Sequence, residues 1–365
     1  MALSCERGNV IGVISHRRGL TESLVGVAGR VEKALGYDSL TGSVEPGDEV
    51  LMNTTAVRLG LGTGGYHFIM ANLSTAGMTG LAPGRIMKLR YTPLQLQVEA
   101  AEERQPEAFG PEAGLSGMPV VCCSLHSQLP GVVFGARAAA GSELRLVYIM
   151  TDGAALPLTI SRLVAWLEED GLLSGTITAG QAFGGEVEAV NLYSALLAAR
   201  LVLRAEVAVV AMGPGIVGTG SAWGTTALEQ GEAVNAAHIL GGQPVAVPRL
   251  SFADPRPRHR GLSHHTLTAL GRVALTPATL VLPRLDGEKA AVLRYQLEES
   301  GLASRHLVVE EDGAPGLELL AESSVPVTTM GRGLEEEREF FLASTAAGQV
   351  AARLAREGRA VPTGA

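Results

Sequence analysis

The sequence predicts an α/β protein in which a C-terminal, largely parallel α/β sandwich follows a small β-rich, barrel-like domain. Up to about residue 98, short β-like runs are separated by turn residues. Residues 99–114 are polar and contain prolines, which is typical of a linker. From residue 115 onward, buried-strand patterns alternate with helical ones. We therefore expect a β-rich domain at 1–98, a linker at 99–114 and an α/β domain at 115–365 that carries the site.

The first domain is expected to form a small curved sheet. Its β-like runs are NVIGVISH, SLVGVAGRVEKALGY, DEVLMNTTAVRLGL and YHFIMANL, at 9–16, 23–37, 48–61 and 66–73. The turn EPGDE at 45–49 and the glycines of LGLGTGGYH at 59–67 allow sharp changes of direction. Such spacing favours a barrel.

The second domain alternates strand and helix patterns throughout. We expect strands at 144–152, 173–180, 206–213, 243–252, 278–285 and 306–312. Helices are expected at 161–170, 188–205, 225–240, 287–300 and from about 334 to 357. This order predicts βαβ connections and hence a parallel sheet.

Unusual loops follow four of these predicted strands. They are TDGAALP, TAGQAFGGE, MGPGIVGTGSAWG and ADPRPRHRGLSHH. In open α/β sheets, ligands bind outside the carboxyl ends of the strands. We therefore expect these loops to share one rim and to form the site there.

Composition excludes several classes of function. A net charge of −8 and a pI near 5.6 argue against a nucleic-acid partner, which requires a broad basic surface. The N-terminal segment lacks the apolar region of a signal peptide, and charges interrupt the most apolar stretch, so no membrane partner is expected. Cys5, Cys122 and Cys123 fit neither a disulfide framework nor a metal knuckle, which favours a reducing cytoplasm.

Several long motifs together resemble one known family. They are LHSQLPG, YIMTDGAALPL, TAGQAFGGE, MGPGIVGTGS and RHRGLSHHT, with GDEVLMNTTAVRLGLGTGGYHF in the N-terminal part. The family is DUF3866, a bacterial domain of unknown function, and the resemblance runs from about residue 8 to the 340s. It implies a bacterial cytoplasmic protein and carries over no activity, cofactor or catalytic residue.

The loop MGPGIVGTGS is a candidate anion-binding element. We expect the backbone of Gly213, Gly215, Gly218, Thr219 and Gly220 to cradle a phosphate or carboxylate before a helix that opens near Thr225. The spacing matches neither the dinucleotide fingerprint nor a Walker loop. The alternative is a tight strand-to-helix turn without a ligand.

Asp152 and His126 are further candidates for acid–base chemistry. Asp152 ends a predicted strand, where a carboxylate can bind a metal, hold a hydroxyl or act as a base. Its alternative role is an Asp-Gly turn. His126 adjoins Ser127, but adjacency in sequence does not make a catalytic dyad, and the chain has no G-x-S-x-G elbow.

The strongest candidate is the segment at 256–265, which concentrates three arginines and three histidines. Ser263 is expected to cap a helix whose first turn holds His264 and His265, which suit acid–base chemistry or metal binding as neutral rings. Arg258 and Arg260 can bind an anion through two parallel hydrogen bonds. The alternatives are a solvated basic loop or a salt-bridge patch between subunits.

Our interpretation is a cytoplasmic hydrolase or group transferase that acts on a small phosphorylated or carboxylated metabolite. Arg258, Arg260 and the 213–220 backbone hold the anion, while His264, His265, Asp152 and His126 supply the chemistry. A divalent metal and a homo-oligomer are left open. The first rival is a non-catalytic metabolite sensor that uses the same cleft, and the second is a scaffold assembled through the β-rich domain.

Overall fold

The computed structural model describes residues 3–75, 77, 80 and 83–360. The chain forms two compact units, Met1–Val98 and Glu99–Ala365.

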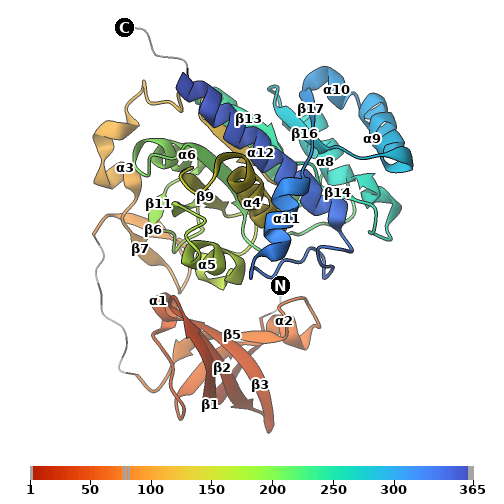
Figure 1. Ribbon diagram of the computed structural model, residues 1–365. Coiled ribbons are helices and arrows are strands. Elements are labelled where there is room, and N and C mark those ends of the chain that lie inside the picture. Colours follow the sequence, from red (N-terminus) through yellow and green to blue (C-terminus); the bar gives the residue numbers. More distant parts are fainter. Residues whose placement is uncertain (1–2, 76, 78–79, 81–82, 361–365) are drawn as a thin grey trace. The chain divides into compact units, whose positions relative to one another are not determined.

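The first unit contains a closed five-stranded barrel, drawn in red and orange in Figure 1. Its strands pair in the order β1-β2-β3-β5-β4, and β3 and β5 are the parallel neighbours. The bounds are β1 Cys5–Arg17, β2 Leu20–Val27, β3 Arg30–Tyr37, β4 Glu49–Asn53 and β5 Tyr66–Asn72. Apolar side chains that include Val25, Val50 and Met52 fill the interior. The predicted barrel-like β domain is therefore confirmed.

Short helices and a hairpin complete this unit. They are α1 Asp38–Thr41, α2 Thr55–Arg58, and the antiparallel pair β6 Ile86–Lys88 and β7 Leu96–Val98. Helix α2 occupies the second half of the run 48–61, which the sequence predicts as β structure. The Asn53 side chain accepts a hydrogen bond from the Thr55 amide at 3.1 Å, which turns the chain out of the strand.

The second unit is built on an eight-stranded sheet in the order β11-β10-β9-β12-β8-β13-β16-β17. Every neighbouring pair in this sheet is parallel, which confirms the predicted α/β class. The bounds are β8 Pro119–Cys122, β9 Leu146–Thr151, β10 Gly175–Ala179, β11 Val187–Ala189, β12 Val207–Met212, β13 Gln243–Ala246, β16 Thr279–Pro283 and β17 Leu307–Glu311. The short pair β14 Leu250–Ser251 and β15 Gly261–Leu262 lies outside this sheet.

Helices cover both faces of the sheet. One core contains side chains of α4 Leu129–Ala140, α5 Arg162–Glu169, α11 Ala314–Glu322 and α12 Arg338–Ala360. The other contains side chains of α6 Leu192–Leu201, α7 Glu229–Ile239, α9 Gly287–Ser300 and α10 Leu302–Arg305. Val121 of β8 belongs to the first core and its neighbour Val120 to the second, as alternation along a strand requires.

Helices α4 and α12 cross at very close range (Figure 1). A Cβ atom on Gly135 would lie 1.9 Å from the carbonyl oxygen of Thr345, and one on Gly348 would lie 2.0 Å from that of Val132. Glycine at both positions is therefore required for this contact.

The direction of the helical connections changes within the sheet. β8 and β9 lead to α4 and α5 on the first core, whereas β12, which lies between them, leads to α7 on the second. Such a reversal opens a crevice at the carboxyl ends of the strands.

The structure corrects two boundaries. Residues 99–114, expected as a linker, belong to the second unit and contain α3 Ala101–Arg104. Ala101 is buried there, and Ala100 pairs with Glu188. The run 243–252, expected as one strand, is divided into β13 and β14, because Pro248 cannot donate a ladder hydrogen bond.

In the part of the chain that the structure describes, no helix combines the length and apolarity needed to cross a membrane.

Candidate functional site

The crevice at the carboxyl ends of β9, β10 and β12 holds Asp152. It is a cavity of about 230 Å³ whose walls also include Glu229 and Glu232 from the first turn of α7. Asp152 accepts a hydrogen bond from the Gln181 amide at 2.8 Å. The lining is acidic and contains no lysine or arginine, so the crevice suits a cation or a hydrogen-bond donor rather than an anion.

Glu229 is a carboxyl group of this crevice with a raised pKa. Burial, with a smaller contribution from the charge of Asp152, raises its pKa to about 7 against the opposing hydrogen bond from Thr151. The Thr151 hydroxyl donates to Glu229 Oε2 at 2.9 Å. A carboxyl group with this pKa is half protonated near neutral pH, so it can act as donor or acceptor there.

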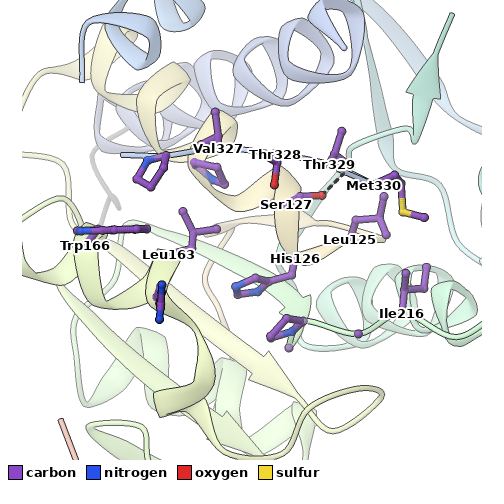
Figure 2. Close-up of a pocket in the computed structure, with 16 residues that line it drawn as sticks. Leu125, His126, Ser127, Leu163, Trp166, Ile216, Val327, Thr328, Thr329 and Met330 are labelled. Carbon is purple, nitrogen blue, oxygen red and sulfur yellow. Dashed lines mark hydrogen bonds between the residues drawn. The ribbon is translucent and has the colours of Figure 1, made fainter. Parts of the chain in front are cut away.

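His126 and Ser127 line a second cavity of about 360 Å³, shown in Figure 2. Nε2 of His126 lies 2.7 Å from Ser161 Oγ and Nδ1 lies 3.1 Å from Tyr148 Oη. Burial lowers the pKa of His126 to about 4. Both ring nitrogens are engaged in the protein interior, which favours a positioning role for this side chain.

Ser127 makes no pair with His126. Its hydroxyl donates to Thr329 Oγ1 at 3.1 Å (Figure 2). The remaining walls of the cavity are mostly apolar and include Leu163, Trp166 and Ile216. The cavity therefore offers an apolar, partly aromatic surface beside the loop that follows β12.

A cluster of three histidines forms at the start of α8 His264–Thr268. The Ser263 side chain caps this helix by accepting from the His265 amide at 3.2 Å, as the sequence predicts. One ligand atom from each of His259, His264 and His265 lies within 4.8 Å of the others. The ring centroids are 4.9 Å apart for the pair 259–264, 5.1 Å for 259–265 and 4.3 Å for 264–265. We call these three residues the histidine cluster.

Two members of the histidine cluster are almost inaccessible, with His259 2% and His265 5% exposed. Burial and nearby arginines lower the pKa of His259 to about 4 and that of His265 to about 3, and they also lower the pKa of His264. The rings are therefore neutral at pH 7. The sequence analysis expects the helix dipole to keep these rings neutral, but the dipole is not the main cause of the lowered pKa values, because α8 spans only five residues.

Hydrogen bonds orient two of the three rings. Nδ1 of His259 lies 2.7 Å from Ser263 Oγ, and Nδ1 of His265 accepts from Arg249 Nη1 at 3.2 Å. Nε2 of His264 is buried and has no hydrogen-bond partner among the described residues. Such an atom is available to a water molecule, an ion or another ligand.

The arginines of the predicted segment have different roles. Arg256 binds both carboxylate oxygens of Asp254, at 2.9 and 2.7 Å, and this pairing is the largest cause of the lowered pKa of Asp254. Arg249 and Arg332 also approach Asp254, at 3.7 and 3.6 Å. Arg256 is therefore a structural residue.

Arg258 and Arg260 are exposed and form no side-chain hydrogen bond or ion pair with any described residue. The charge of Arg258 contributes to the lowered pKa of His264. The guanidinium carbon of Arg258 lies 3.9 Å from the place where Gly220 would carry a Cβ atom. Arg258 is thus free to bind an anion beside the histidine cluster, whereas Arg260 lines another cavity whose walls include four glutamates.

The glycine loop reaches the histidine cluster but has a different shape from the expected cradle. Residues 217–226 form a hairpin in which the Thr219 amide donates to the Gly224 carbonyl at 2.8 Å and the Thr226 amide to the Val217 carbonyl at 3.0 Å. Thr219 therefore has no amide to offer an anion. A Cβ atom on Gly218 would lie 3.5 Å from the His265 ring, so the hairpin packs over that ring.

The structure thus places the predicted site residues in three neighbouring places. The histidine cluster, Arg258 and the hairpin come together. The loop of Asp152 contacts the segment between β12 and the hairpin, where the Ala155 amide donates to the Pro214 carbonyl at 3.1 Å. Asp152 itself is in the acidic crevice and is not among the potential metal ligands of the histidine cluster.

Sequence reasoning missed several contributors. His259 stands in the segment it singled out, but no expected helix placed it beside His264. Asp254 also lies in the loop ADPRPRHRGLSHH, but its pairing with Arg249 and Arg332 depends on the fold. Glu229 lies in a predicted helix, and its sequence gives no sign of its burial or raised pKa.

A family model described as "Protein of unknown function (DUF3866)" matches residues 33–348. Neither a curated protein nor a solved structure matches the chain. The match covers the greater part of the chain and both units, and the chain therefore belongs to the DUF3866 family.

Proposed function

We propose that the protein is a bacterial cytoplasmic enzyme that hydrolyses, or transfers a group from, a small phosphorylated or carboxylated metabolite. One observation carries the proposal. Three neutral histidine rings converge beside Arg258, a guanidinium that no side chain of the described residues neutralises. Enzymes of this kind combine a reacting centre with a group that holds the anion.

Arg258 and Arg260 supply the anion-binding half. A guanidinium binds two oxygens of a phosphate or carboxylate at once, which fixes the orientation of the substrate as well as its charge. Asp254 does not neutralise Arg258, because its ion pairs among the described residues are with Arg249, Arg256 and Arg332. The surplus of positive charge around the histidine cluster favours an anionic substrate.

The histidine cluster supplies the reacting half. In hydrolysis, a water oxygen forms a bond to phosphorus or to the acyl carbon, and the bond to the leaving oxygen breaks with its electron pair. A proton then passes from the attacking water to the leaving oxygen. A neutral imidazole can accept this proton, and His264 Nε2 has no hydrogen-bond partner among the described residues to compete for it.

The apolar cavity of Figure 2 provides room for the rest of the metabolite. Gly215 and Ile216 line that cavity, and Gly218 packs on His265. Two residues of chain span at most about 7 Å, so the cavity and the cluster are close enough for one small molecule. Cys122 and Cys123 are buried free thiols, which agrees with a reducing cytoplasm.

The test uses calorimetric titration of the full-length protein with inorganic phosphate and acetate. We expect Arg258→Lys to weaken binding about tenfold despite the retained charge, because the two parallel hydrogen bonds are lost. Arg258→Ala should weaken it further, and Arg260→Lys should act in the same direction. Arg294→Lys, at an exposed arginine of α9, is the matched control and should bind as the wild type does.

Unchanged affinity in both Arg258 variants would contradict the anion site. Turnover is measured separately, as phosphate or acid release from a panel of phosphate monoesters and carboxylic esters. Release that is lost in His264→Ala supports the enzyme. Phosphate binding with no release from any member of the panel would instead favour the sensor.

A further inference from the structure

We infer that the histidine cluster is a binding site for a divalent transition-metal ion of the Zn²⁺ type, held by one ring nitrogen each of His259, His264 and His265. The inference rests on the proposed function in so far as it assigns a cofactor to the same reacting centre. Three imidazoles with an open fourth position form a common set of ligands for a catalytic metal ion.

The geometry of the cluster is close to what such an ion requires. A tetrahedral ion with bonds of about 2.0–2.1 Å holds its nitrogen ligands about 3.3 Å apart. The potential ligand atoms here lie within 4.8 Å of one another, and the rings are inclined at 49°, 82° and 56° rather than stacked. Small side-chain rotations suffice to bring three lone pairs onto one point.

His264 provides an independent reason. Its Nε2 atom is buried, borders two other imidazoles and has no hydrogen-bond partner among the described residues. Leaving a buried polar atom unsatisfied destabilises the folded protein. A metal ion at this place satisfies that atom.

Ser263 orients the His259 ring through a hydrogen bond of the kind that is common at metal sites. A metal-bound imidazole usually makes a hydrogen bond through its other nitrogen, which fixes the ring. Nδ1 of His259 lies 2.7 Å from Ser263 Oγ, so Nε2 is the nitrogen that remains for an ion.

His265 must change its hydrogen bond when the ion binds. Arginine can only donate, so Nδ1 of His265 is unprotonated in its contact with Arg249 and the proton is on Nε2. Coordination through Nε2 moves that proton to Nδ1, and Arg249 must then turn away. Asp254 is available as its partner, since Oδ2 lies 3.7 Å from Arg249 Nη2.

The charges around the site couple the metal to the anion. Arg249, Arg256 and Arg258 all oppose a bare cation, and no carboxylate belongs to the group of potential ligands among the described residues. A phosphate that bridges Arg258 and the ion offsets this repulsion. The structure therefore predicts that phosphate strengthens metal binding and, by thermodynamic reciprocity, that the metal strengthens phosphate binding by the same factor.

The experiment uses chelator-treated, full-length protein titrated with Zn²⁺ by calorimetry and with Co²⁺ by visible absorption. We expect one ion per chain, an absorption spectrum typical of four- or five-coordinate Co²⁺, and tighter binding when inorganic phosphate is present. His259→Ala and His264→Ala should each lower the affinity at least about a hundredfold, more than the loss typical of outer-shell changes. His238→Ala, which removes an exposed histidine of α7, should leave it unchanged.

Thermal unfolding of the metal-free variants shows whether they fold. The absence of stoichiometric binding by the wild type, or full binding by folded His259→Ala and His264→Ala, would overturn the metal site. If no ion binds while Arg258→Lys still weakens phosphate binding, the metal inference fails and the proposed function stands. If the ion binds as expected but phosphate does not, the proposed function fails and the metal site stands.

Discussion

Glu229 makes the stability of the protein depend on pH in a direction that can be measured. We consider Glu229→Gln, which keeps an oxygen to accept the hydrogen bond from Thr151 but removes the charge. Burial raises the pKa of Glu229 from an ordinary value of 4.5 to about 7. The folded protein therefore resists ionisation of this carboxyl group, and the unfolded chain does not.

The sign and size of the effect follow from this difference. Below pH 4.5 the carboxyl group is protonated in both states, so it costs nothing. Between pH 4.5 and 7 the unfolded chain ionises first, and the free energy of unfolding falls; above pH 7 the loss is constant. A rise of this size in the pKa corresponds to about 3 kcal/mol, and the partial exposure of the group reduces this to about 2–3 kcal/mol.

Urea denaturation of wild type and variant at several pH values between 4.5 and 8.5 measures the effect. The difference in free energy of unfolding, variant minus wild type, should increase by about 2–3 kcal/mol over this range in favour of the variant. Glu298→Gln, at an exposed position of α9, controls for the change in net charge.

A second variant tests the cause. The charge of Asp152 contributes to the raised pKa, so Asp152→Asn should reduce the pH dependence of the Glu229→Gln effect. A difference that stays constant with pH, or that increases toward low pH, would refute the reasoning.

Three further predictions concern separate parts of the second unit. Asp254→Asn should lower the free energy of unfolding by about 3–5 kcal/mol in urea denaturation, because it leaves three arginines without their shared carboxylate; a loss below 1 kcal/mol would contradict this network. Gly135→Ala should lower the free energy of unfolding by about 1–3 kcal/mol or more, and with it the thermal midpoint, because its methyl group meets the Thr345 carbonyl of α12; an unchanged midpoint would show that the helices can move apart without cost. Trp166→Ala should weaken binding of phosphate esters that carry an apolar group while leaving inorganic phosphate unaffected in calorimetry; equal losses for both would argue against the cavity as a substrate subsite.

The sheet was predictable because its strands carry their own signal. Runs such as EVAVVAMG are apolar at successive positions, which is typical of a strand buried on both faces, and their alternation with helices fixes the parallel direction. The sequence of residues 99–114 suggests a linker for the opposite reason. Its polarity reflects exposed positions around Ala101, and one buried alanine in a short helix gives no periodicity.

The candidate site was predictable in part. The density of arginine and histidine marked residues 256–265, and Ser263 marked the start of the helix. The separation of Asp152 from the histidine cluster could not be predicted, because it depends on the order of the strands in the sheet. β12 and β8 lie between β9 and β13, so the strand that precedes Asp152 and the strand that precedes the histidine segment are about 14 Å apart in the sheet.

The arginines show why the density of charge in a sequence overstates the capacity to bind an anion. Arg256 looks equivalent to Arg258 in the sequence, yet its fork is filled by Asp254, two residues away. Asp254 is in turn shared with Arg249, five residues before it, and with Arg332, which is distant in the chain. The local excess of positive charge is therefore smaller than the segment suggests. Beside the histidine cluster it is located on Arg258, whereas Arg260 lines a cavity that also contains glutamates. A small anion that binds Arg258 next to the histidine cluster is attracted by this excess, whereas a polyanion would also be repelled by the carboxylates of an acidic protein.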